Sequence, residues 1–422
     1  SAASDVYRRQ AISHSHQLNI QQQNQNSSVG AFFNYTDQQG LLHNNYAKRI
    51  SAKFTYDAKP REWFELNSNL MVNHMWGNTV DDTGGGQTAR RTMWEMPPIL
   101  PVKFPDGSYS STQYPGSKLN LGLEGMSNPL QELLERKKGR YRTKLFGNVA
   151  VVFHLADGLS LRSQIGVDAN FRQDKNYSPN NLVGISSRGE ASFYNAQWLY
   201  WQEETYLNYN KLLKDKHRIN ATLGASWSKD TKEHNQTGNV YDFDTNYYGY
   251  DNLGAGKTPS APASGYSSWT MNSYFARASY TYNDKYLMTA TMRIDGSSRF
   301  GKNNKYGYFP SAGLGWVISN EDFFRVKWIN NLKVRASYGR TGNTEIDPYK
   351  TLSTMASGTT LINGGREVTS EISRMPNPDL EWEKTDQFDA GFNLGMFDNR
   401  INLEFDFYQT VSYTHLTLPT IA

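Results

Sequence analysis

Hydrophobic and polar residues alternate, one by one, over several long stretches of this chain. In residues 401–408, one set of alternate positions holds Ile401, Leu403, Phe405 and Phe407, and the other holds Asn402, Glu404, Asp406 and Tyr408. The stretches 159–172, 286–295 and 332–337 follow the same pattern. Successive side chains of a β-strand point to opposite faces, so each stretch predicts a strand with one apolar and one polar face.

These stretches have the length of strands that cross a membrane. They run for roughly ten residues, which a tilted strand needs to cross the hydrocarbon layer, whereas strands of soluble domains commonly have about five or six. Short connections alternate with long links, as in an outer-membrane barrel. We predict an all-β fold, a transmembrane antiparallel β-barrel of which this chain holds about 14 strands. The predicted pairs are 16–24 with 28–37, 48–58 with 63–74, 144–155 with 159–173, 199–212 with 217–229, 273–282 with 285–296, 308–319 with 331–341, and 386–396 with 400–409.

The connections add two predictions. The longest link, residues 77–143, is expected to be extracellular, because it joins an upward strand to a downward one. The spacing of Leu130, Leu133 and Leu134 predicts a short helix within it, and the segment has too little apolar periodicity to form a separate inserted domain. Two pairs are predicted to form tight turns, Asn283-Asp284 and Asp398-Asn399.

Composition supports the barrel. Hydrophobic residues make up 37% of the 422 residues, the mean hydropathy is -0.70, and no run of about 18 apolar residues could span a bilayer as a helix. Aromatic residues nevertheless make up 14% of the chain. A soluble chain of such low hydropathy would struggle to bury them, whereas aromatic girdles at two membrane interfaces would account for them.

Charge and cysteine content limit the partners. The 44 basic and 40 acidic side chains are spread evenly and give a net charge of +4, so no basic block predicts nucleic-acid binding. The absence of cysteine excludes a disulfide framework and thiolate metal sites. The first ten residues lack a charged region followed by an apolar core, so any export signal is expected upstream.

Several stretches resemble the SusC/RagA family of TonB-dependent outer-membrane importers. The most specific is 285–324, in which RIDGSSRFG is followed by GYFPS and a strand with a tryptophan. LKVRASYGRTGN at 332–343 and the segment from NPDLEWEKTDQF at 377 to 408 resemble other parts of the barrel, and FFNYTDQQGLL with YAKRISAKFTYDAKPREWFELNSNL resembles its beginning. The resemblance spans about residues 1–410.

The resemblance implies a larger receptor. Its barrel would have about 22 strands around a plug, so we expect a partial barrel at residues 1–410, with the plug domain, the TonB box, the export signal and the closing strands absent. After Gln409 the sequence TVSYTHLTLPTIA continues neither the alternation nor the family pattern and looks like translated sequencing-adapter sequence. We therefore expect residues 411–422 to be a non-native or artefactual tail.

The function implied by the resemblance is TonB-dependent import of an oligomeric nutrient, a glycan or a peptide, across the bacterial outer membrane. The implied partners are a SusD-like surface lipoprotein that acts as a lid, and the TonB complex, which would act through the missing N-terminal part. A passive porin or diffusion channel is the alternative. A soluble propeller is disfavoured, because no repeat of about 40 residues is visible. We expect no cofactor and no enzymatic activity, since no phosphate loop and no nucleophile elbow occur.

Aromatic residues in the predicted loops are the candidates for substrate binding, because their rings could stack on sugar faces. Those put forward are Trp94, Tyr114, Tyr248 and Trp269. Packing within the loops or at a membrane interface is the simpler explanation for most of these rings, and also for Tyr109, Tyr247 and Tyr250.

For three other groups of residues, we expect a structural role and no metal or ligand binding. His14 and His16 could place two imidazoles on one strand face, but without further ligands we expect a polar pair facing the lumen. Asp81, Asp82 and Asp106, with the glycines at 84–86, could bind calcium, but they lack EF-hand spacing and we expect no metal site. In DGSSRFGKNN, Asp295-Gly296 and Gly301 are expected to form turns, and Arg299 to pair with a carboxylate on a neighbouring strand.

Overall fold

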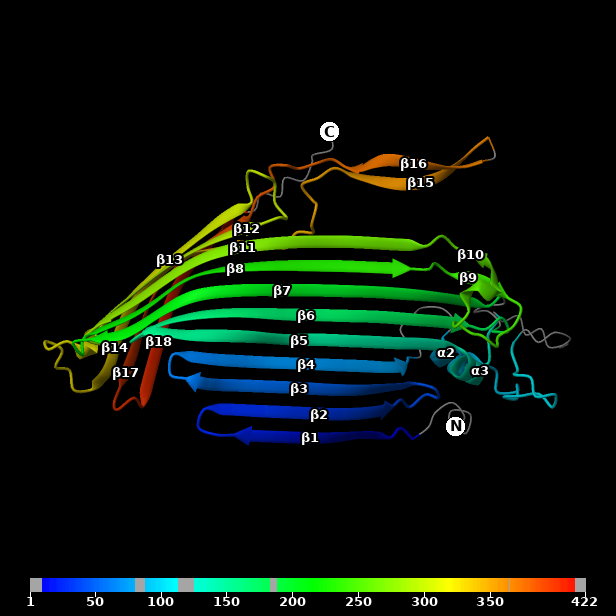
Figure 1. Ribbon diagram of the computed structural model, residues 1–422, viewed down its shortest axis with the longest axis horizontal. Coiled ribbons are helices and arrows are strands. Elements are labelled where there is room, and N and C mark those ends of the chain that lie inside the picture. The colour runs from blue at the N-terminus through cyan, green and yellow to red at the C-terminus, as the bar shows by residue number, and fades with distance from the viewer. Residues whose placement is uncertain (1–9, 80–87, 113–124, 183–187, 364, 414–422) are drawn as a thin grey trace.

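Fourteen strands lie side by side in one curved antiparallel sheet in a computed structural model of the chain (Figure 1), which describes residues 10–79, 88–112, 125–182, 188–363 and 365–413. The strands are β1 (Ser13–Gln23), β2 (Ser27–Gln39), β3 (Tyr46–Arg61), β4 (Phe64–Asn78), β5 (Lys137–Ala156), β6 (Leu159–Ser178), β7 (Glu190–Leu213), β8 (His217–Gln236), β11 (Ala263–Tyr282), β12 (Tyr286–Ser297), β13 (Tyr306–Val317), β14 (Ile329–Asn343), β17 (Glu383–Met396) and β18 (Ile401–Tyr413). They pair in this order, so every predicted pair and the all-β class are confirmed.

The sheet is a curved wall. Among the described residues, β1 and β18 each pair with one neighbour only. The last strand, β18, continues to Tyr413 and pairs with Lys384 there. Residues 411–413 of the expected tail are thus in a strand and 414–422 lie outside the described residues, so the origin of that tail stays a prediction.

Several elements were not predicted. Two short strands, β9 (Val240–Phe243) and β10 (Gly256–Pro259), form a hairpin beside β7, and β15 (Thr354–Ile362) pairs with β16 (Gly365–Arg374) in a separate sheet. The predicted helix is present as α3 (Pro129–Glu135), which packs against an unpredicted helix, α2 (Ala89–Glu95). Two short 3-10 helices, η1 (Leu253–Ala255) and η2 (Ile318–Asn320), complete the fold.

The short connections and the long links occupy opposite ends of the sheet (Figure 1), which we call the turn end and the loop end. At the turn end, Asn283 and Asp284 have φ of 49° and 50°, and Asp398 and Asn399 have φ of 58° and 59°. Asparagine and aspartate tolerate this left-handed region better than most residues. Both predicted tight turns are confirmed.

The strands at the centre of the wall are longer than predicted. Strands β5, β6, β8 and β11 have 20 residues each and β7 has 24. The sequence pattern predicted only the half of each strand near the turn end, because the alternation of apolar and polar residues is confined to that half. Toward the loop end both faces become polar, although the backbone pairing continues.

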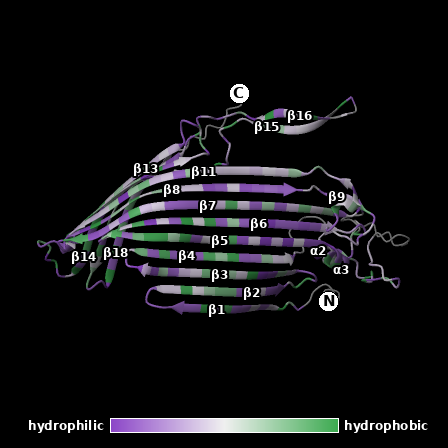
Figure 2. Cartoon of the chain, in the orientation of Figure 1, coloured by the Kyte–Doolittle hydropathy of each residue, from purple (hydrophilic) through white to green (hydrophobic). Residues whose placement is uncertain are grey.

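Hydrophobic and hydrophilic residues intersperse along the strands (Figure 2). Each strand has one face with most of its apolar residues, which we call the apolar face, and an opposite polar face. On β6 the apolar face runs from Leu161 to Phe171 and turns polar at Gln173, and on the neighbouring β7 it ends at Leu199. Glu203 interrupts this face, and Ser163 and Thr205 donate hydrogen bonds to its carboxylate. Strand register therefore aligns the apolar residues into a continuous band.

Aromatic residues border this band at the turn end. Tyr286 and Trp316 stack with ring centroids 6.4 Å apart, and Trp316 Nε1 donates to Glu321 Oε1 at 3.0 Å. Lys285 Nζ lies 3.0 Å from Glu321 Oε2. Hydrogen bonds from Tyr286, Trp316 and Lys285 lower the pKa of the Glu321 carboxyl to about 2. Rings with bonded polar tips are typical of a membrane interface.

In the described part of the chain, no helix is both long enough and apolar enough to cross a membrane.

The orientation of the wall can be tested with a protease. A protease added to intact cells should cut within residues 77–143, whose described parts include α2 and α3 at the loop end. It should spare the turn at Asp157, which lies at the opposite end. Immunoblotting of the fragments gives the measurement. Cleavage confined to Asp157 would contradict the predicted orientation.

Candidate functional site

Aromatic side chains line the polar face of the wall near the loop end. Tyr194, Trp198 and Tyr200 occupy alternate positions of β7 on this face. Across the sheet on β11, Trp269 lies with its ring centroid 6.2 Å from that of Tyr200. Tyr194 also stacks against His234 of β8, with ring centroids 6.0 Å apart. These rings form a strip that crosses β7, β8 and β11.

A polar cavity adjoins this strip at Trp269. It has a volume of about 220 Å³ and is lined by residues of β8, β11 and two loops, which include Asp230, Lys232, Trp269, Arg299 and Asp347. The guanidinium carbon of Arg299 lies 4.5 Å from the centre of the Trp269 ring. The cavity therefore combines an aromatic surface with charges of both signs, which suits a ligand with both ring faces and polar groups.

The predicted ion pair between Arg299 and a carboxylate on a neighbouring strand is not observed among the described residues. Among the ion pairs of the described residues, none includes Arg299; its Nη1 instead donates to the backbone oxygen of Thr344 at 2.7 Å, and the guanidinium packs on Trp269. Its Nε is buried without a hydrogen-bond partner. Burial lowers the pKa of this guanidinium, although Asp230, Asp347 and Glu345 oppose that shift.

Three arginines gather around one aspartate farther along the same face, and we call this group the arginine patch. Asp174 of β6 accepts from Arg142 Nη1 at 2.6 Å and from Arg172 Nη2 at 2.6 Å, and Arg140 Nε lies 4.0 Å away. The Arg172 guanidinium also lies 5.0 Å from the Tyr194 ring centre. The patch is thus continuous with the aromatic strip.

The other candidate residues lie apart from this strip. Trp94 is on α2 and is 75% exposed. Tyr248 lies in the loop between β9 and β10, where Tyr250 packs against Tyr177 and Phe243. Tyr177 lies on the same face of β6 as Phe171, so this packing is on the apolar face of the wall. Tyr114 lies outside the described residues. Of the three candidates within the described residues, only Trp269 lies in the strip.

Packing explains two of the remaining loop aromatics. Burial raises the pKa of the Tyr250 hydroxyl to about 12, and the Lys103 ammonium lies 4.5 Å from the ring centre of Tyr109. Tyr247 is 84% exposed and meets Tyr248 edge to face, with ring centroids 5.3 Å apart.

The prediction that His14 and His16 face the lumen is wrong. On β1 they alternate with Ser15 and Gln17, so they share the apolar face with Leu18 and Ile20, just beyond the apolar residues. Their rings lie 5.2 Å apart, and His14 lies 6.1 Å from Tyr35 on the next strand.

Most residues of the disfavoured calcium-binding alternative, Asp81, Asp82 and the glycines at 84–86, lie outside the described part. Asp106 Oδ1 accepts from the backbone nitrogen and hydroxyl of Ser108, as in a surface turn. Within the described ranges, no cluster of three or more His, Asp or Glu side chains could hold a metal ion.

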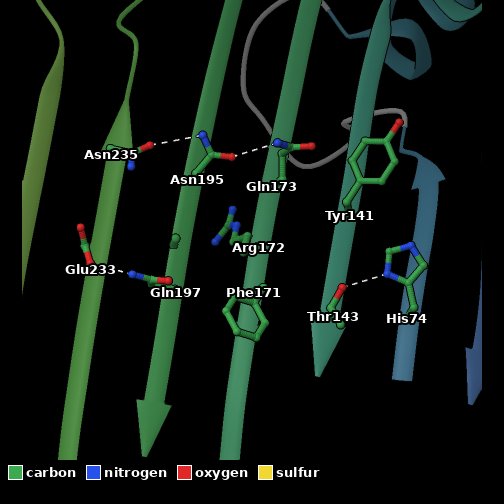
Figure 3. A pocket seen from close by; sticks show the side chains of 11 residues that line it. His74, Tyr141, Thr143, Phe171, Arg172, Gln173, Asn195, Gln197, Glu233 and Asn235 are labelled. Atoms are coloured by element: carbon green, nitrogen blue, oxygen red, sulfur yellow. Dashed lines mark hydrogen bonds between the residues drawn. The ribbon is translucent and has the colours of Figure 1, made fainter. Parts of the chain in front are cut away.

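A larger cavity of about 450 Å³ opens on the other side of the wall (Figure 3). Gln173 donates to Asn195 at 3.1 Å and Asn195 donates to Asn235 at 3.2 Å, while Gln197 donates to Glu233 at 2.6 Å. These positions share the face of Phe171. The cavity therefore lies beyond the apolar band and does not open toward the aromatic strip.

The RIDGSSRFG stretch has a structural role, but the predicted turn at Asp295-Gly296 is wrong, because both residues lie in β12 and pair with its neighbours. Phe300 from this stretch, Phe309 from GYFPS, and Leu380 and Trp382 from NPDLEWE form one buried cluster, which we call the motif core. A Cβ on Gly301 would lie 1.9 Å from the Pro378 backbone oxygen, so only glycine permits this close approach. Met271 and Ile346 pack on the motif core, and Ile346 also lines the cavity at Trp269.

Comparison with known proteins identifies the family. Residues 103–412 match the family described as TonB dependent receptor-like, beta-barrel. The chain belongs to this family. The resemblance predicted from RIDGSSRFG and the other stretches is therefore confirmed, and the polar face of the wall is the one that lines the lumen in a barrel of this family.

Two similar proteins are also named as TonB-dependent receptors. The chain is 30% identical to TonB-dependent receptor P3 of Formosa agariphila over 98% of its own length and 41% of that protein. It is 28% identical to TonB-dependent receptor SusC of Bacteroides thetaiotaomicron over 95% of its length and 41% of that protein. The chain thus spans less than half the length of each of these receptors.

Solved structures show the same fold. The RagAB peptide importer in its closed-closed state matches 97% of this chain and 45% of its own, with a TM-score of 0.77 and 24% identity. The RagAB open-open state gives the same TM-score over 96% of this chain. The wall of fourteen strands therefore has the same fold as part of the RagAB structures.

Proposed function

We propose that the chain forms part of an outer-membrane importer that takes up an oligomeric nutrient, a glycan or a peptide, with energy from the TonB complex. The observation that carries this proposal is the aromatic strip and its cavity at Trp269, which lie on the lumenal face near the loop end. Family membership supplies the energy coupling, and the apolar band supports a position in the outer membrane.

The proposal includes components beyond the described residues. We propose that residues 1–410 contribute to a barrel of about 22 strands filled by a plug domain, and that a SusD-like lipoprotein covers its mouth. RagAB, which has the same fold, is a peptide importer. We also propose that residues 411–422 do not belong to the native barrel, and that the protein acts as a transporter with neither a catalytic site nor a cofactor.

TonB dependence separates this importer from a passive channel. Cells that produce the intact receptor should take up labelled oligosaccharides or peptides only when the TonB complex is functional. A passive pore would admit them equally in cells that lack TonB. Uptake that is unchanged by loss of TonB would overturn the proposal.

Replacement of Trp269 with alanine tests the site. The substitution removes the ring that borders the cavity, and uptake at low substrate concentration should fall about threefold to tenfold, as expected for loss of one stacking surface. Trp328→Ala is the matched control, because Trp328 stacks on Phe397 at the turn end, away from the cavity. Equal effects of the two substitutions would count against a cargo site at Trp269.

A further inference from the structure

The arginine patch presents positive charge to the lumen. Arg142 and Arg172 share the Asp174 carboxylate, so these two guanidiniums and one carboxylate carry a net charge of +1. The Asp174 side chain is only 7% exposed, whereas those of Arg142 and Arg172 are 31% and 51% exposed. The single anion is therefore covered by the cations, and the surface that the lumen meets is cationic.

The Asp174 carboxylate has a structural role. Arg142 donates to one of its oxygens, and Arg172 donates to the other through both Nε and Nη2. The carboxylate thus fixes two guanidiniums that would otherwise repel each other. No hydrogen bond within the described residues engages Arg172 Nη1, and a fixed, planar guanidinium binds carboxylate or sulfate oxygens well.

The charges that adjoin the patch on β5 and β6 do not cancel it. Lys144 and Asp168, which lie on the same face nearer the turn end, pair with each other at 3.2 Å. Asn176, on the loop side, is neutral and accepts from Arg140 at 2.9 Å. Across β7, the cavity at Trp269 holds Lys232 and Arg299 beside three carboxylates, Asp230, Glu345 and Asp347, and Asp230 accepts from Trp198.

Aromatic rings continue from the patch. Tyr194 contacts Arg172, and Trp198, Tyr200 and Trp269 follow on the neighbouring strands. Adjacent strands are about 4.8 Å apart, so the strip extends about 14 Å across the strands from β6 to β11. Tyrosine and tryptophan faces suit sugar rings. Aromatic rings that continue from guanidiniums thus match an oligomer in which rings bear negative groups.

We infer that the lumenal wall selects acidic oligosaccharides, and that Arg172 binds their carboxylate or sulfate groups while the aromatic strip holds the sugar rings. This inference rests on the proposed import function and names the class of cargo. An acidic peptide would satisfy the arginine patch but would make little use of the rings.

The test compares ligands that differ only in charge. Calorimetry with the purified intact receptor should show tetragalacturonate binding about tenfold more tightly than its methyl ester, the difference expected from one charge-assisted hydrogen-bonded contact. Arg172→Gln should abolish most of this preference. Added salt should reduce it as well. A sulfated tetrasaccharide shows whether sulfate is also accepted.

Arg162→Gln is the matched control. Arg162 lies on the same strand and face, nearer the turn end, and its Nε donates to Gln164 at 3.3 Å. The substitution removes the same charge from the lumen but should leave the preference unchanged. Heat-modifiable migration on a gel verifies that both variants are folded, which is expected because Arg142 still pairs with Asp174 in Arg172→Gln.

Each other outcome overturns the inference. Equal binding of tetragalacturonate and its ester, binding of neither, or equal effects of the two substitutions would exclude selection of acidic sugars by Arg172. Binding of tetra-aspartate in place of the sugars would assign the patch to acidic peptides. Uptake that does not require TonB would instead refute the import proposal and leave a measured binding preference intact.

Discussion

Trp382→Ala should destabilise the barrel by about 3 to 5 kcal/mol, the range for loss of a large buried aromatic side chain. Trp382 is only 3% exposed and contacts Phe300 and Phe309, with ring centroids 5.0 Å and 5.1 Å away. Its Nε1 donates to the Lys305 backbone oxygen at 2.9 Å, so the substitution also removes a hydrogen bond. Denaturant unfolding of the receptor in lipid bilayers measures the loss.

Trp94→Ala provides the control for this change. Trp94 is 75% exposed, so its removal should alter the free energy of unfolding by less than about 0.5 kcal/mol. If the two substitutions had the same effect on the free energy of unfolding, the buried packing of the motif core would not stabilise the barrel.

Met292→Arg should cost about 2 to 4 kcal/mol, because a charge on the apolar face of a barrel near the bilayer midplane must be buried in hydrocarbon. Met292 lies on β12 between the borders of the apolar band, with Ala276 and Pro310 opposite it on the adjacent strands. Unfolding in bilayers again gives the measurement.

Thr289→Arg is the matched substitution on the same strand. Thr289 faces the polar side and bonds to Ser279 at 3.1 Å, so its replacement should project into the lumen, where water solvates the charge. A small cost for Met292→Arg, or an equal cost for both, would contradict the assignment of the apolar face to lipid.

The strands could be predicted because alternation is a local property of the sequence. β12 and β18 show it residue by residue, and the membrane imposes it on one face. The alternation is lost in the halves of β5 and β7 that lie near the loop end. β15 and β16 have weak alternation, although the Asn363-Gly364 pair between them was an available hairpin signal.

The candidate site could be predicted only in part, because it depends on contacts between distant residues. Trp269 was identified by residue type, but its contact with Arg299 requires the loop after β12 to fold back on β11. The arginine patch joins β5 and β6 through their register, which no short motif encodes. His14 and His16 were assigned to the wrong face by polarity, whereas their parity with Leu18 gives the correct one.

The motif core has a consequence for how such genes are classified. Phe300, Phe309 and Trp382 join the loop after β12, strand β13 and the approach to β17, and none of them lines the cavity at Trp269. Most of the stretch that makes the chain easiest to recognise in a genome therefore carries information about architecture, and within it only Arg299 lines the cavity. A group of receptors defined by RIDGSSRFG would include importers of many different substrates. Classification by substrate requires comparison of positions such as 172 and 269.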